Sequence, residues 1–90
     1  MQEQVFRYEV PVDDQWHTLN LSGEILHVGS RATPNIVEVW ALDHGSKADK
    51  TARDFRVFGT GQLLQDAKHL RHVGTTVAQA YFVWHLFERV

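Results

Sequence analysis

The chain has 90 residues, a formal net charge of −2 and no cysteine. This length fits one domain, so we expect residues 1–90 to fold as a single unit. The missing cysteines exclude disulfides, cysteine-ligated zinc and thiol catalysis. Nine Lys and Arg are dispersed among eleven Asp and Glu, a balance that disfavours nucleic-acid binding. Because we find no signal peptide and no apolar run of membrane-spanning length, we expect a cytoplasmic protein without a membrane partner.

Hydrophobic residues alternate with a period of two along most of the chain, which is the period of β-strands. Turn residues interrupt the alternation at 11–14, 22–23 and 31–34. We expect Ser22 and Gly23 to form a tight hairpin turn and residues 43–54 to form a long polar loop. The predicted strands cover residues 4–10, 16–21, 24–30, 35–42, 55–58, 71–78 and 81–90. We expect the last two to form a hairpin through Gln79 and Ala80.

The expected fold is therefore all-β: a small antiparallel β-sandwich or barrel of six to seven short strands. Residues 62–70 carry the only helical pattern, with Leu63, Ala67 and Leu70 at helical spacing. Nine residues are marginal for a helix, so we expect at most one short helical turn there. Because strands follow one another without intervening helices, the pattern excludes a parallel doubly wound sheet.

The stretch FRVFGTGQ (55–62) raises the question of a ligand site, since glycines after a strand can let the backbone approach a phosphate. A dinucleotide fingerprint needs a small residue where this chain has Leu64, and a phosphate-binding loop needs a lysine that is absent. The pattern therefore favours a structural corner of the fold. The alternative is a small anionic or polar ligand on the amides of Gly59, Thr60 and Gly61.

No catalytic or metal-binding constellation stands out. Six histidines are many for this length, yet no two are spaced i, i+2 on a strand, and we expect no metal site. Ser22, Ser30 and Ser46 lie in predicted turns or loops, away from any nucleophile motif. We therefore expect a protein that is not an enzyme and has no catalytic residues and no cofactor. His85, flanked by apolar residues, is typical of a core or interface imidazole.

The last predicted strand, YFVWHLFERV, is apolar on both faces. One face carries Val83, His85 and Phe87, and the other carries Phe82, Trp84 and Leu86. Such a strand lies either between two covered faces or at an interface with another chain. Since 90 residues rarely cover both faces of a strand, we expect self-association through this strand.

Six stretches of the chain resemble a family of short, uncharacterised proteins of bacteriophages and prophages, especially those of actinobacteria: YEVPVDDQWHTLNL, EILHVGSR, VEVWAL, FRVFGTGQ, HVGTT and FVWHLFE. The GTG after a strand, the VGT of residues 73–75 and the terminal WHLFE are the most specific parts. Family members tend to have prolines where this chain has Leu63 and Leu64, and a glycine-rich turn in place of Gln79 and Ala80. The resemblance implies a phage setting, in the cytoplasm of an infected bacterial host, and implies no mechanism.

Three functions fit these observations. The first is a non-enzymatic phage accessory protein that binds a host protein, in takeover or counter-defence. The second is a homo-oligomeric sponge for a small nucleotide-like molecule, held by backbone amides and aromatic rings. The third is a minor virion or structural protein. The candidate ligand- or partner-binding residues are Gly59, Thr60, Gly61, Trp40, Trp84 and His85.

Overall fold

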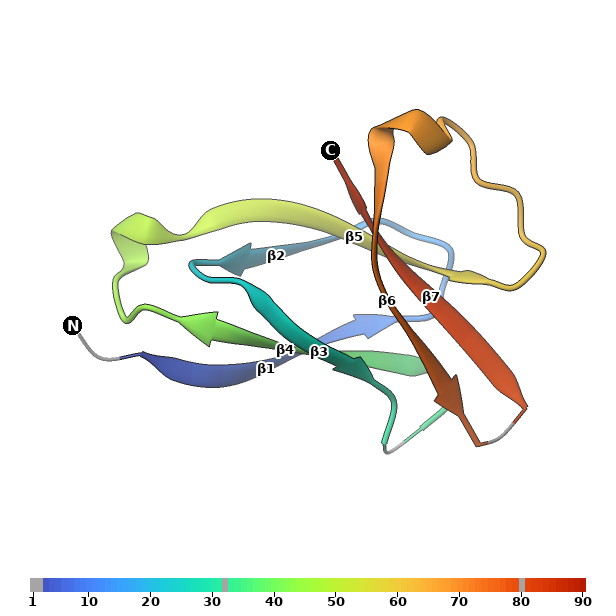
Figure 1. Ribbon diagram of the computed structural model, residues 1–90, viewed down its shortest axis with the longest axis horizontal. Helices are drawn as coiled ribbons and strands as arrows, with labels where there is room; N and C mark the ends of the chain where they lie inside the picture. Colours follow the sequence, from blue (N-terminus) through green and yellow to red (C-terminus); the bar gives the residue numbers. More distant parts are fainter. Residues whose placement is uncertain (1–2, 32, 80) are drawn as a thin grey trace.

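The computed structural model describes residues 3–31, 33–79 and 81–90 (Figure 1). Most of them lie in strands, which confirms the predicted all-β class. The strands are β1 (Gln4–Pro11), β2 (His17–Leu21), β3 (Ile25–Gly29), β4 (Ile36–Asp43), β5 (Thr51–Gly59), β6 (Leu70–Ala78) and β7 (Phe82–Arg89). In this described part of the chain the only helical elements are two single 3-10 turns, Lys47–Asp49 and Ala67–His69. The second lies inside the segment for which the sequence predicts a helical turn.

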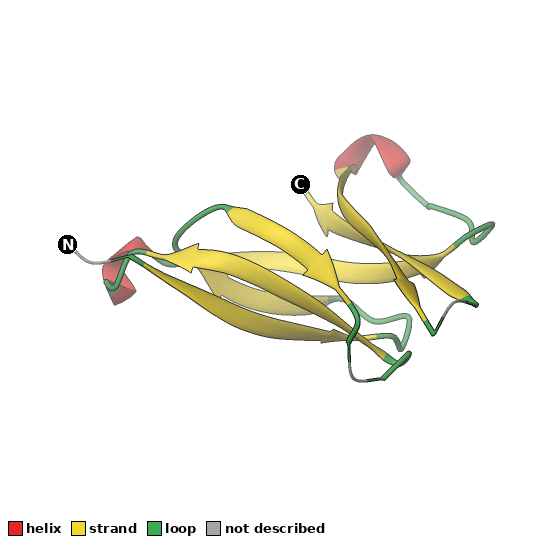
Figure 2. Ribbon diagram, turned by 60° about the horizontal axis from the view of Figure 1, so that its bottom comes forward, coloured by secondary structure: helices red, strands yellow, loops and turns green. Residues whose placement is uncertain are grey.

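Two antiparallel sheets lie face to face, as Figures 1 and 2 show. One sheet has the strand order β1-β4-β3, and the other has the order β2-β5-β7-β6. The molecule is flat, with principal extents of 42 × 30 × 17 Å. Of the two architectures that the sequence leaves open, the chain therefore adopts the sandwich.

The inner faces of the two sheets share one apolar core. Val39 of β4, Phe55 of β5 and Leu86 of β7 are completely buried in it. The rest of the cluster consists of Val10, Leu21, Val28, Val37, Ala41 and Val57. These residues occupy the apolar positions of the period-two alternation, so the sequence pattern predicts which side chains form the core.

The last strand, β7, is an interior strand. It pairs with β5 on one side and with β6 on the other, so both of its backbone edges are occupied. Its inner face carries Leu86, and its outer face carries the half-buried Val83, His85 and Phe87. Self-association through this strand would have to use its side chains rather than its paired backbone edges, and it stays a prediction. The expected hairpin through Gln79 and Ala80 joins antiparallel neighbours, but Ala80 itself lies outside the described residues.

The connection at Ser22 and Gly23 is not the hairpin turn that we expected. β2 pairs with β5 and β3 pairs with β4, so this connection crosses from one sheet to the other. Gly23 passes very close to β4: a Cβ atom on it would lie 2.5 Å from the carbonyl oxygen of Leu42. The glycine is needed for this close approach of two backbones rather than for a tight turn.

The polar segment 43–54 is also more ordered than expected, because β5 begins at Thr51. The first residues of β5 pair with β2. The sequence predicts a loop there only because the side chains of these residues are polar. Arg53, for example, points to the inner face of the sheet and forms an ion pair with Glu88 of β7. Glu88 is 5% exposed and also contacts Arg71 of β6, so it ties three neighbouring strands together. The hydrogen bond from Arg53 is the main reason that the pKa of Glu88 is lowered.

A second buried glutamate, Glu38 of β4, lies on the outer face of the three-stranded sheet and is 3% exposed. Its carboxylate accepts hydrogen bonds from Nε and Nη2 of Arg31, at 3.0 and 2.9 Å, and from Nη1 of Arg7 at 3.0 Å. The side-chain hydrogen bonds from Arg31 are the main cause that lowers the pKa of Glu38 from its ordinary 4.5 to about 2. Folding therefore favours the charged form of this carboxylate.

We predict that this fold loses stability as the pH falls from 4.5 to about 2, the interval between the unfolded and folded pKa of Glu38. Above that interval the carboxylate is charged in both states, and its contribution to stability is complete. Urea unfolding midpoints measured across the interval test this. Glu38→Gln should weaken the pH dependence, whereas the exposed control Glu24→Gln should keep it. A Glu38→Gln variant with the full parental dependence would contradict the prediction.

Candidate functional site

An aromatic ring is buried on the outer face of the four-stranded sheet. Phe58 of β5 points away from the core that its neighbour Val57 enters, yet it is only 4% exposed. Trp16, just before β2, packs against it edge-on at a centroid distance of 6.3 Å, and Phe87 of β7 does so at 5.5 Å. The loop 60–69 connects β5 to β6 (Figure 1), and its residues line a cavity together with Phe58.

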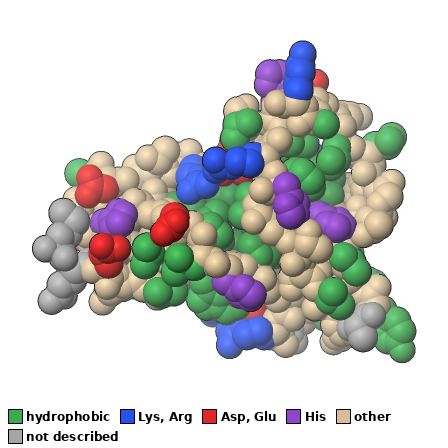
Figure 3. Space-filling view, in the orientation of Figure 1, with side chains coloured by type: hydrophobic (Ala, Val, Ile, Leu, Met, Phe, Trp, Pro, Cys, Tyr) green, Lys and Arg blue, Asp and Glu red, His purple; other side chains and the backbone are tan. Residues whose placement is uncertain are grey.

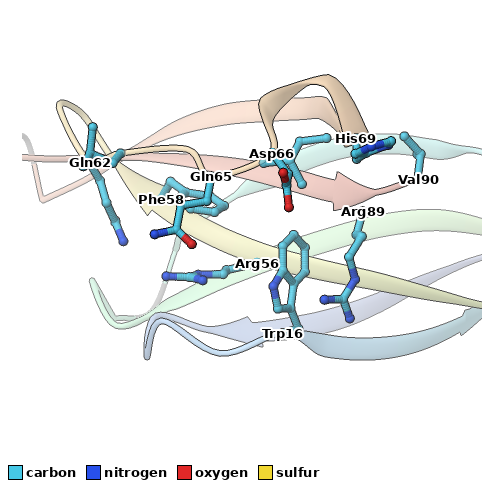
Figure 4. Close-up of a pocket in the computed structure, with 11 residues that line it drawn as sticks. Trp16, Arg56, Phe58, Gln62, Gln65, Asp66, His69, Arg89 and Val90 are labelled. Atoms are coloured by element: carbon cyan, nitrogen blue, oxygen red, sulfur yellow. The ribbon is translucent and has the colours of Figure 1, made fainter.

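Between this loop and the sheet lies a cavity of about 700 Å³, shown in Figure 4. The side chain of Trp16 stands between those of Arg56 and Arg89 at the sheet side of the cavity, while Gln65 and Asp66 reach toward them from the loop. A volume of this size is within the range of small-molecule sites, roughly 300–1,000 Å³. Aromatic surface and a few convergent polar groups are the lining that such sites have.

The two arginines of the cavity lie over its aromatic rings. The guanidinium carbon of Arg56 is 4.7 Å from the ring centroid of Phe58, and that of Arg89 is 4.5 Å from the ring of Trp16. Arg89 also donates to a carboxylate oxygen of Asp54 at 2.9 Å. Planar guanidinium groups held against rings are suited to carboxylate or phosphate groups, because their N–H donors keep a fixed geometry.

Arg56 is poorly compensated. Its Nη2 lies 3.8 Å from Oδ1 of Asp14, which is a long contact for an ion pair. Its Nε is buried and has no hydrogen-bond partner among the residues that the structure describes. A buried donor without a partner is costly. The Arg56 side chain as a whole is 25% exposed, and an anion could approach that exposed part.

The GTG corner holds the covering loop in place. The side-chain oxygen of Gln62 accepts a hydrogen bond from the Gly59 N–H at 3.0 Å, and its amide nitrogen donates to Oδ1 of Asp14 at 3.0 Å. Gln62 therefore links the end of β5 to the turn between β1 and β2, beside the cavity. Gly61 has a φ of +89°, which L-residues with a side chain rarely adopt.

Most of the binding residues predicted from the sequence lie at a second, shallower hollow. Gly59, Thr60 and Trp84 line this open hollow, which has a volume of about 390 Å³. Gly61 follows Thr60 directly in the chain, and His85 is hydrogen-bonded to Thr60. Trp40 is elsewhere: it belongs to β4, in the other sheet.

Hydrogen bonds hold His85 in a chain of side chains on the outer face of the four-stranded sheet. Its Nε2 lies 2.8 Å from Oγ1 of Thr60, and its Nδ1 lies 2.9 Å from Oγ1 of Thr75, which is 2.8 Å from Nε2 of His72. Both nitrogens of His85 are thus engaged, which fixes the ring. Within residues 3–31, 33–79 and 81–90 no group of three or more His, Asp or Glu side chains could hold a metal ion.

The sequence did not predict the residues of the deeper cavity, because they are far apart along the chain. Arg56 and Phe58 do share one face of the strand FRVF, and an arginine beside an outward-facing phenylalanine was the available signal. Trp16 and Arg89 join them only through the pairing of β2 and β7 with β5.

We predict that Gly61→Val destabilises the fold by about 1–3 kcal/mol, the cost of a strained backbone. A Cβ at this position would meet no heavy atom within 4 Å, so the effect reports backbone conformation rather than a clash. Gly61→Asn should cost less, because asparagine tolerates positive φ better. Urea unfolding of the three proteins checks this, and a valine variant as stable as the parent would show that the corner does not need glycine.

Comparison with known proteins identifies a family for this chain but does not indicate an activity. No curated protein and no solved structure matches the chain. No helix in the described part of the chain is long and apolar enough to cross a membrane. A family described as "Domain of unknown function (DUF7352)" matches residues 1–90. The chain therefore belongs to the DUF7352 family, whose function is unknown.

Proposed function

We propose that this protein is a non-enzymatic binding protein that holds a small anionic, nucleotide-like molecule in the cavity under loop 60–69. One observation carries the proposal: Arg56 and Arg89 lie over aromatic rings at the wall of one cavity, and the guanidinium of Arg56 is poorly compensated. The phosphate or carboxylate of the ligand would approach Arg56. Its planar ring would lie beside Trp16, since rings and guanidinium planes favour stacked arrangements.

The loop would supply selectivity. Gln65 and Asp66 line the cavity opposite the sheet and offer amide and carboxylate groups to the polar edge of a ring. A net charge of −2 for the whole chain does not oppose this, because the charge of a site depends on the groups that line it. The resemblance to bacteriophage proteins supports a setting in an infected bacterium, where the protein would act as a sponge for such a molecule.

A thermal-shift screen with nucleoside monophosphates and cyclic nucleotides tests the proposal. A ligand at about 100 times its Kd stabilises the folded state by about 2.7 kcal/mol, which raises the melting temperature measurably. We predict stabilisation by at least one nucleotide. The matching nucleoside and inorganic phosphate should each stabilise less, because each keeps only one of the two recognised features.

Single substitutions test whether the ligand binds in the cavity under loop 60–69. Arg56→Met should weaken the Kd about tenfold to a hundredfold, since a hydrogen bond to a charged group is worth about 1.5–3 kcal/mol. Lys47→Met removes the same charge in the distant 3-10 turn and should bind like the parent. The proposal fails if no nucleotide at millimolar concentration stabilises the chain, or if Arg56→Met keeps the full shift.

A second candidate function, binding of a host protein, is favoured by the apolar tip formed by β6, β7 and the turn between them. Tyr81 is 88% exposed, Val77 56% and Phe82 44%, and Figure 3 shows hydrophobic side chains at its lower right, where this turn lies. Tyr81 and Phe82 also line the shallow hollow at Gly59 and Trp84. Exposed aromatic residues next to one another are typical of protein-binding surfaces.

Affinity capture from a bacterial host lysate tests this second function. A host protein should be retained in stoichiometric amount by the parent and lost with the double variant Tyr81→Ser/Phe82→Ser. Leu26→Ser is the matched control, because it removes an exposed apolar side chain (49%) from the other sheet. The tip is not the binding surface if capture survives the double variant, and this function loses its support if nothing is captured stoichiometrically.

A further inference from the structure

The first strand has a free outer edge. β1 pairs with β4 on one side, and none of the described residues pairs with its other side (Figures 1 and 2). Just beyond the paired residues, the N–H of Val12 donates to the carbonyl of Asn35 at 2.8 Å. Because hydrogen-bonded pairs alternate in antiparallel sheets, the even-numbered residues of β1 bond to β4. Val5, Arg7 and Glu9 therefore point their N–H and C=O groups outward.

β1 is the edge best suited to pairing with another strand. The edge strands β2 and β3 have five residues each, and the nine-residue edge strand β6 is interrupted by a register shift between His72 and Gly74. β1 has eight residues in unbroken register with β4. Val5 and Phe6 on it are 56% and 41% exposed. A long, regular and partly apolar edge offers its unpaired N–H and C=O groups as a template for another strand.

We propose that two copies of this chain join through β1, antiparallel, with Tyr8 opposite Tyr8 of the second copy. The three-stranded sheets of the two copies would then form one continuous six-stranded sheet. The proposal is independent of the cavity under loop 60–69, which belongs to the other sheet. It places self-association at the first strand, whose edge is free, rather than at β7, whose edges are both paired.

The side chains of β1 are complementary to themselves in this register. On the outer face Arg7 lies opposite Glu9 of the second copy, and Val5 lies opposite Pro11. On the inner face Phe6 lies opposite Val10. Opposite charges and apolar pairs across two strands both stabilise a sheet. The outward-bonding residues also meet one another, as the hydrogen-bond pattern requires.

The neighbouring registers that keep the hydrogen-bond pattern are worse. Moving the centre of the pairing by one residue places Arg7 opposite Arg7, or Glu9 opposite Glu9, and like charges directly opposite are destabilising. The charge pattern Arg7-Tyr8-Glu9 thus selects one register out of three.

Single cysteine variants test the register directly, because the chain contains no cysteine. In Tyr8→Cys the two thiols belong to a non-hydrogen-bonded pair, whose Cα atoms lie about 4.5 Å apart, within reach of a disulfide. Phe6→Cys is the matched control: in this register its two positions are about 14 Å apart. After mild oxidation, Tyr8→Cys should run as a covalent dimer on a non-reducing gel and Phe6→Cys as a monomer.

Sedimentation equilibrium tests the dimer without a cross-link. The parent should give about twice the 10.4 kDa of one chain. Val5→Pro removes an outward N–H without removing a bond to β4, and Glu9→Arg places two arginines opposite each other, so both should give folded monomers. Glu24→Arg makes the same charge change away from β1 and should stay dimeric.

A parent chain that is monomeric, or dimers that survive Glu9→Arg, would overturn the proposal. Cross-linking of Phe6→Cys as fast as that of Tyr8→Cys would overturn the register. If Val5→Pro fails to fold, the comparison of Glu9→Arg with Glu24→Arg decides.

Discussion

The burial of Phe58 is the constraint on which the candidate site depends. Its ring leaves the sheet on the side away from the shared core, yet only 4% of it is exposed. Trp16, Phe87 and the loop 60–69 supply the cover that a second sheet supplies on the inner face. A loop and a few side chains fill space less completely than two interlocking sheet faces, so a cavity of about 700 Å³ remains. The cavity is a consequence of covering a large ring with a loop.

The charges of the chain make this cavity suitable for an anion. Five arginines lie within hydrogen-bond distance of a carboxylate: Arg7 and Arg31 at Glu38, Arg53 and Arg71 at Glu88, and Arg89 at Asp54. Arg56 differs, because its carboxylate contact in the described part of the chain is at 3.8 Å, to Asp14. Glu38 and Glu88 are thus each held by two arginines, whereas Arg56 at the cavity has the weakest compensation of the six guanidinium groups.

Much of the fold could be predicted from the sequence, because a strand with one buried face keeps its period of two. The prediction failed where a residue meets a requirement other than burial of one strand face. Thr51 begins a strand whose polar side chains form ion pairs and hydrogen bonds. Gly23 allows two backbones to approach closely. The deeper cavity could not be predicted. Trp16, Arg56 and Arg89 come from three distant segments, and only the strand order of the four-stranded sheet brings them together.

The three tryptophans lie at three different surfaces, so their indole N–H resonances can separate the candidate sites in one NMR titration. Trp16 lines the deep cavity, Trp84 lines the shallow hollow, and Trp40 lies in the other sheet. If the cavity binds nucleotides, titration with AMP or with the best nucleotide of the thermal-shift screen should move the Trp16 resonance and leave the other two in place. Movement of Trp84 in its stead, or of none of the three at saturating nucleotide, would contradict binding in the cavity.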